Sequence, residues 1–128
     1  TTQPRRVFQR AALSEPFVGI LRILLTSVVQ GLAHLDYCDD AALRWLQDDV
    51  IDIDTHRTGG LLELTFPDRS KIIINTQPPL QELWLAAKAG GHHYRHVAGR
   101  WLDTRDGSEF FAVLSRNASA QAGKPLSF

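Results

Sequence analysis

The chain has 128 residues, of which 44% are hydrophobic and 22% charged, and its formal net charge is zero. These values are typical of one globular domain with a modest core. A net charge of zero argues against general nucleic-acid binding, because domains that bind phosphates carry a basic surface. The single cysteine, Cys38, excludes an internal disulfide framework and a zinc site built from several cysteines, and it favours a reducing compartment.

Residues 1–35 are predicted to form an N-terminal extension whose role the sequence does not define. A helix over residues 17–35 is predicted from apolar residues at spacings of three and four, namely Phe17, Leu21, Leu24, Val28, Leu32 and Leu35. Arg22, Gln30 and His34 interrupt this run and argue against a membrane span. The Arg-rich, acid-poor opening is also typical of an organellar targeting segment, and a native extension is the alternative.

Negative charge is concentrated in one short stretch. Between residues 36 and 54 one base, Arg44, stands against seven aspartates, namely Asp36, Asp39, Asp40, Asp48, Asp49, Asp52 and Asp54. Carboxylate oxygens suit Fe³⁺, and accept Fe²⁺, Mn²⁺ and Ca²⁺. A solvated acidic face is the alternative, and complementarity to a helix dipole explains part of the cluster. On an open surface, metal binding is expected to be weak and unselective.

The elements expected after residue 35 are one helix followed by a series of strands. A second helix is predicted over residues 37–47, with Ala42, Leu43, Trp45 and Leu46 toward a core. The period then changes to two, which predicts a strand whose wet face carries Asp52 and Asp54, with Cβ atoms about 7 Å apart. Further strands are predicted over residues 61–66, 71–76, 81–86, 93–96 and 100–103.

A closing helix is expected near the C-terminus. Asp106 is predicted to be its N-cap, with Glu109 three residues on, and Gly123 to end it. Its buried stripe is expected to comprise Phe110, Phe111, Leu114 and Ala118. The order of helix, about six strands and helix predicts an α+β fold with two helices packed on one face of an antiparallel sheet.

Other chemistry-bearing residues have mostly structural interpretations. On a strand, His92 and His96 share one face and His93 points to the other, so three-histidine metal coordination is not expected. Cys38 is expected to be a half-buried structural thiol, with no group to orient it toward His34. No phosphate loop, serine triad or HExxH motif occurs, so no catalytic residue is predicted.

Trp84 is expected to be exposed on the sheet beside Asn75 and Gln77, which is typical of a protein-contact patch. Partial cover of Trp84 by the chain around Gln77–Pro79 is the alternative.

Several linked motifs from the first predicted strand onward resemble the frataxin family. They are Asp52–Asp54, Gly60–Phe66, Ser70–Asn75, Gln77–Pro78, Leu83–Leu85, Gly90–His93, Arg100–Trp101 and Gly107–Phe110, and the run Gln121–Phe128 is similar to bacterial, CyaY-type members. The resemblance implies a frataxin-like α/β sandwich over residues 36–128. The residues before Asp36 depart from the family, whose first helix is usually rich in acidic residues.

The resemblance also implies a function. Weakly bound iron, Fe²⁺ or Fe³⁺, would lie on an acidic ridge formed by the seven aspartates, and the protein would act as an adaptor in iron–sulfur cluster assembly. Its expected partners are the cysteine desulfurase and the iron–sulfur scaffold machinery, contacted through Asn75, Gln77 and Trp84 as well as through the ridge. No nucleic acid or membrane partner is expected, and the chain is expected to be monomeric, or to oligomerise with iron.

Two alternatives remain beside the adaptor. One is a ferroxidase or iron-storage protein, and the other is an interaction domain whose acidic residues only steer a basic partner. The expected location is the bacterial cytoplasm, or the mitochondrial matrix if the N-terminal segment is the remnant of a targeting sequence.

Overall fold

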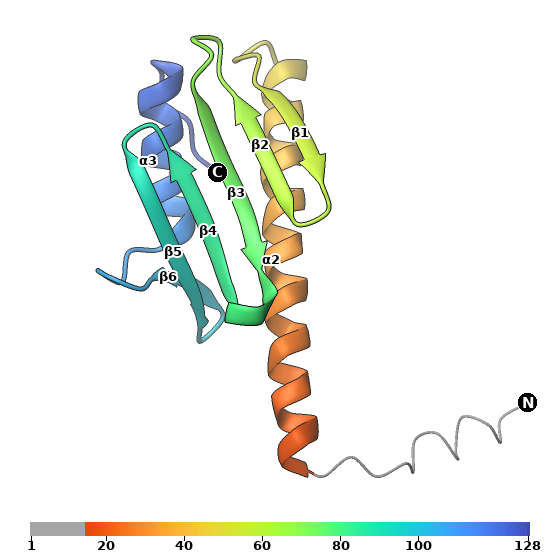
Figure 1. Cartoon of the computed structure of the whole chain (residues 1–128). Coiled ribbons are helices and arrows are strands. Elements are labelled where there is room, and N and C mark those ends of the chain that lie inside the picture. Colours follow the sequence, from red (N-terminus) through yellow and green to blue (C-terminus); the bar gives the residue numbers. More distant parts are fainter. Residues whose placement is uncertain (1–14) are drawn as a thin grey trace, which may run out of the picture.

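The computed structural model describes the backbone of residues 15–128 and the side chains of residues 29–128. Its elements are α2 (Glu15–Gln47), β1 (Asp54–Thr58), β2 (Leu61–Thr65), β3 (Lys71–Gln77), the 3₁₀ helix η1 (Pro78–Leu80), β4 (Glu82–Ala87), β5 (Gly90–Val97), β6 (Arg100–Asp103) and α3 (Phe110–Ala122). The strands form one six-stranded sheet in the order β1-β2-β3-β4-β5-β6, and each antiparallel pair joins neighbours in the chain. Figure 1 shows α2 and α3 covering the same face of the sheet. The predicted fold is therefore confirmed.

The prediction of two helices, over residues 17–35 and 37–47, is wrong. The chain forms one 33-residue helix, α2, because neither proline nor glycine lies between Leu32 and Gln47 to interrupt it. At 1.5 Å per residue α2 is about 50 Å long, which is roughly twice the length of β5, the longest strand in the sheet. Its first turns accordingly run past the end of the sheet (Figure 1).

The expected domain boundary at residue 35 lies inside α2, and a separate role for residues 1–35 stays a prediction. Four members of the predicted apolar stripe, Phe17, Leu21, Leu24 and Val28, have side chains outside the described residues. Within the described part of the chain, no helix has both the length and the apolar character needed to cross a bilayer.

The face that α2 turns to the core differs from the prediction at its C-terminal end. Leu35, Cys38 and Ala42 are buried and follow helical spacings of three and four. Leu43 and Leu46 were expected inside, but they are 53% and 49% exposed. The small residue Ala42 thus contacts the sheet, and its neighbour Leu43 is rotated about 100° away from it.

The core lies between the sheet and the two helices. Alternate strand residues point into it, as period-two patterns predict, and they include Leu62, Leu64, Phe66, Ile72, Ile74, Leu83, Leu85, Tyr94 and Trp101. From α3 the buried residues Phe110, Val113, Leu114 and Ala118 complete it. Phe111 is only partly buried, because it lies at the margin between α3 and α2, where it stacks on His34 with ring centroids 4.6 Å apart.

The first strand begins later than predicted. Val50 and Ile51 donate their N–H groups to the carbonyl of Trp45 at 2.8 and 3.4 Å, so these residues complete the C-terminus of α2 instead of opening a strand. Asp49, with a positive φ of 56°, makes the required reversal. β1 starts at Asp54, and Asp52 precedes it.

The N-cap of α3 is also corrected. Glu109 is the N-cap, and its carboxylate accepts hydrogen bonds from the N–H groups of Phe111 at 2.7 Å and Ala112 at 3.1 Å. Asp106 instead accepts from the N–H of Ser108 at 2.9 Å and forms the turn before the helix. Gly123 ends α3 with a left-handed φ of 70°, as predicted.

Candidate metal-binding and partner-binding surfaces

The seven aspartates come from consecutive parts of the chain and do not converge on one point. Asp36, Asp39 and Asp40 lie on α2, Asp48 and Asp49 follow its end, Asp52 precedes β1, and Asp54 is the first residue of β1. We call these seven residues the acidic segment. Among the residues whose side chains are described, no three His, Cys, Asp or Glu groups are placed to hold one metal ion. The acidic segment therefore offers dispersed carboxylates and not a closed coordination sphere.

Asp36 is partly neutralised by a residue of the adjacent strand. Arg57 Nη1 lies 2.6 Å from Asp36 Oδ1, and its Nε donates to the carbonyl of Gly59 at 2.8 Å. This ion pair ties α2 to β1 across 21 positions of sequence. Because the Asp36 side chain is 70% exposed, the pair contributes little stability, but it makes Asp36 a poorer metal ligand than its neighbours.

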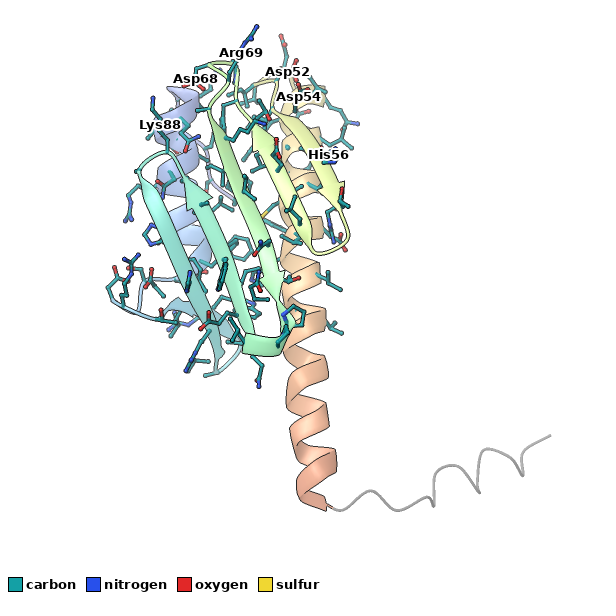
Figure 2. The ribbon with its side chains drawn as sticks, viewed as in Figure 1. Asp52, Asp54, His56, Asp68, Arg69 and Lys88 are labelled. Atoms are coloured by element: carbon teal, nitrogen blue, oxygen red, sulfur yellow. The ribbon has the colours of Figure 1, made fainter. Side chains whose placement is uncertain are left out.

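Asp52 and Asp54 share an open surface hollow of about 460 Å³. Its other lining residues are Thr65, Phe66, Pro67, Arg69 and Lys71, from the end of β2, the β2–β3 turn and the start of β3. Figure 2 shows Asp52, Asp54 and Arg69 together at this end of the sheet. Lys71 is held by Glu63, with Nζ and Oε1 2.6 Å apart, and this hydrogen-bonded lysine lowers the pKa of Glu63. The hollow thus brings two carboxylates together with two basic side chains, of which Lys71 is paired with Glu63.

His56 is a residue that the sequence reasoning missed. It lies two residues after Asp54 on β1, so the two side chains point to the same face (Figure 2). Its Nε2 lies 3.1 Å from the hydroxyl of Thr58. The alternation Asp52, Asp54, His56 in the sequence could have indicated it as a third polar group along this edge.

The predicted contact residues Asn75 and Trp84 do lie side by side. Asn75 pairs with Trp84 between β3 and β4, and Trp84 pairs with His93 between β4 and β5. The three form one row on the sheet face that the helices leave open. Gln77 lies in the next row, and its Nε2 donates to Asn75 Oδ1 at 3.2 Å.

Trp84 is half-buried and not exposed as predicted. The imidazole of His93 stacks on its indole with ring centroids 4.2 Å apart and planes only 6° from parallel. Trp84 Nε1 also donates to Glu82 Oε1 at 2.8 Å, so the ring is held in a defined orientation.

The remaining candidates have structural roles. His92 and His96 face inward with Tyr94 while His93 faces outward, as predicted. His92 Nδ1 lies 2.9 Å from Asp103 Oδ2. Burial by itself raises the pKa of Asp103, but the hydrogen bonds from the backbone N–H of Arg105 and from His92 outweigh it, so the pKa of Asp103 is lowered. Cys38 is fully buried, which corrects the half-buried expectation, and burial raises its pKa to about 12, so it is not a nucleophile.

An antiparallel sheet with two helices on one face and a carboxylate-bearing first helix and strand edge defines a frataxin-like α/β sandwich. A family model described as a frataxin-like domain matches residues 32–124. The chain therefore belongs to the frataxin-like family.

Individual relatives support this assignment. A protein from Polaromonas sp. named "Iron-sulfur cluster assembly protein CyaY" is 65% identical to this chain over 77 residues. The match covers 60% of this chain and 66% of the Polaromonas protein. The protein of that name from Burkholderia mallei is 52% identical over 104 residues, with 81% of this chain and 93% of its own covered.

Solved structures show the same fold. The frataxin from Psychromonas ingrahamii, of the CyaY family, is 32% identical, with a TM-score of 0.63 over 78% of this chain and 95% of its own. A trimeric frataxin from the yeast Saccharomyces cerevisiae, complexed with ferrous iron, is 26% identical, with a TM-score of 0.61 over 74% of this chain and 87% of its own.

Proposed function

We propose that this protein takes part in iron–sulfur cluster assembly as an iron-binding adaptor. The observation that carries the proposal is the match to the frataxin-like family together with relatives named for that process. A yeast relative complexed with ferrous iron supports iron as the ligand. The acidic segment is the part of this chain whose oxygen donors suit that ion.

Iron binding should be weak and strongest near Asp52 and Asp54. These two carboxylates share the hollow beside β1, whereas Asp36 is engaged by Arg57. With at most a few carboxylate oxygens per site, the ion keeps most of its water ligands. Few bonds form between the ion and the protein, so the affinity is low. Arg69 at the rim opposes cation entry and lowers affinity further.

The partner contact is proposed to have two parts. The acidic segment attracts a basic surface of the cysteine desulfurase, and Asn75, Gln77 and Trp84 provide a contact to the assembly machinery that depends less on charge. Exposed carboxylates act over about a Debye length, so the first part should weaken as salt rises. If the desulfurase affinity is the same at low and high salt, this part of the proposal fails.

The test is an anaerobic Fe²⁺ titration followed residue by residue in amide NMR spectra. We expect selective broadening over Asp36–Asp54 and the β2–β3 turn, with the strongest effect at Asp52 and Asp54. The variant Asp52→Asn with Asp54→Asn should lose that local effect, whereas the control Asp106→Asn, in the loop after β6 at the opposite edge of the sheet, should not. Broadening that is uniform, or that survives in the double variant, would contradict the proposed site.

A ferroxidase would differ from an adaptor in its turnover of oxygen. Oxygen uptake per added Fe²⁺, compared between the protein, buffer and the Asp52→Asn with Asp54→Asn variant, separates the two. We expect uptake equal to that of buffer, because the described carboxylates do not converge on one metal position. The cytoplasm is the proposed location, and a monomer is the proposed state in the absence of iron.

A further inference from the structure

A second hollow, of about 360 Å³, opens where α3 meets two turns at one end of the sheet. Its lining comes from the β2–β3 turn, the β4–β5 turn and α3, and comprises Asp68, Lys88, Ala89, Asn117, Ala120 and Gln121. We call it the turn hollow. Figure 2 shows Asp68 and Lys88 on neighbouring turns at this end of the sheet. The turn hollow shares no residue with the acidic segment or with the row of Asn75, Trp84 and His93, and its volume suits a small molecule.

One buried side chain holds both turns in place. Gln121 is 8% exposed, its Oε1 accepts from the N–H of Lys88 at 3.0 Å, and its Nε2 donates to Ser70 Oγ at 2.9 Å. The Ser70 hydroxyl donates in turn to Asp68 Oδ1 at 2.6 Å, and the N–H of Ser70 donates to the same oxygen at 2.9 Å. Because these bonds use Oδ1 of Asp68, its Oδ2 can accept from a ligand. The two turns that carry Asp68 and Lys88 are thus fixed before any ligand arrives.

The turn hollow carries one charge of each sign. The hydrogen bonds from Ser70 lower the pKa of Asp68, and the positive charge of Lys88 adds a smaller effect in the same direction. No ion pair joins Asp68 to Lys88 among the side chains that the structure describes. The neighbouring cations Arg69 and Lys71 line the hollow beside the acidic segment instead. A ligand with one charge would therefore meet one attractive and one repulsive group, whereas a ligand with both charges meets two attractive groups.

A buried amide also lines the turn hollow. Asn117 is 7% exposed, and asparagine is an unfavourable residue in the interior of a helix such as α3. In the described part of the chain its side chain makes one hydrogen bond, from Nδ2 to the carbonyl of Val113 at 2.9 Å. The Oδ1 of Asn117 is therefore left to accept from a ligand. Ala89 and Ala120 contribute only methyl groups, which favours a ligand with a small side chain.

We propose that the turn hollow binds a free α-amino acid with a small side chain, in its zwitterionic form. Lys88 Nζ contacts the carboxylate, and Asp68 Oδ2 and Asn117 Oδ1 accept hydrogen bonds from the ammonium group. The two charges are exposed, so the binding is weak, with a Kd on the order of 10 mM. The inference does not rest on the proposed function, because it uses neither iron nor the acidic segment, and either can fail alone.

The experiment titrates L-alanine into the full chain at about pH 7 in low-salt buffer, followed by NMR. We expect saturable shifts at the backbone amides of Ser70, Lys88 and Ala89 and at the side-chain amides of Asn117 and Gln121. Acetate and methylammonium each carry one of the two charges, and each should bind at least about tenfold more weakly, because one attraction is lost and one repulsion remains. This comparison uses the unaltered protein, so it does not depend on the folding of a variant.

A pair of double variants tests the residues. Asp68→Asn with Lys88→Gln removes both charges without changing the net charge, and asparagine can still accept from the N–H two residues on. We expect it to bind L-alanine about tenfold more weakly, a few-fold for each exposed charge. The matched control is Asp106→Asn with Arg116→Gln, because Asp106 also accepts from the N–H two residues on, at 2.9 Å. The control should change the affinity less than about twofold.

Four results would overturn the proposal. One is the absence of saturable shifts at these residues up to about 100 mM L-alanine. A second is acetate or methylammonium binding as tightly as L-alanine, which would indicate a contact with a single charge. A third is an unchanged affinity in Asp68→Asn with Lys88→Gln. The fourth is an equal loss of affinity in the matched control, which would indicate a general electrostatic effect.

Discussion

The Gln121 side chain joins α3 to two turns of the sheet, and its replacement by leucine should be costly. Gln121 is 8% exposed. Its Oε1 accepts from the N–H of Lys88 at 3.0 Å, and its Nε2 donates to Ser70 Oγ at 2.9 Å and to the carbonyl of Lys71 at 3.1 Å. Gln121→Leu keeps nearly the same volume but removes all three hydrogen bonds. At a net value of about 1 kcal/mol each, the free energy of unfolding should fall by about 3 kcal/mol.

Urea unfolding followed by tryptophan fluorescence measures this loss. With a urea slope of about 1.5 kcal/mol per molar, the midpoint should fall by about 2 M. Gln121→Glu retains the acceptor for Lys88 but loses the two donated bonds, so it should be destabilised as well. The exposed Gln47→Leu on α2 is the control and should change stability by less than about 0.5 kcal/mol. A loss below about 1 kcal/mol for Gln121→Leu would refute the reasoning.

Three further predictions concern single groups. Burial lowers the pKa of His34 below its usual 6.5, so the unfolded chain binds a proton more readily than the folded chain and the protein loses stability as the pH falls below 6.5. The variant His34→Phe should weaken this pH dependence, measured as urea midpoints from about pH 7 to about pH 5, and an unchanged dependence would contradict the prediction. Cys38 should react with a thiol reagent only as fast as the protein unfolds, and rapid labelling of the native protein would show that it is accessible. Glu109→Ala should lower the free energy of unfolding by about 1 kcal/mol through loss of the N-cap, whereas Glu109→Asn should restore most of it; equal losses would argue against capping.

The strands were predictable because their signals are local. In residues 61–66 the alternation of Leu62 and Leu64 with Glu63 follows directly from the two-residue period of a strand, and the structure buries the two leucines. The fold class followed from the order of such elements, and the frataxin motifs added independent support that the family match confirms.

Element boundaries were less predictable where two local signals compete. The alternation of Ile51 and Ile53 with aspartates is a valid strand pattern, but the C-terminal turn of α2 uses the N–H groups of Val50 and Ile51 first. The break expected at Asp36 failed for a related reason, since an aspartate on the outer face of a helix is tolerated when solvent and Arg57 accommodate its charge.

By itself the sequence determined which residues could face the core, which could bear charge, and to which family the pattern is similar. Only the tertiary structure decided which of these residues meet. The ion pair of Asp36 with Arg57 and the stack of His93 on Trp84 depend on strand register and on how α2 lies against β1. Periodicity specifies the direction in which a side chain points, whereas its neighbours come from other elements, and their placement depends on the packing of the whole chain.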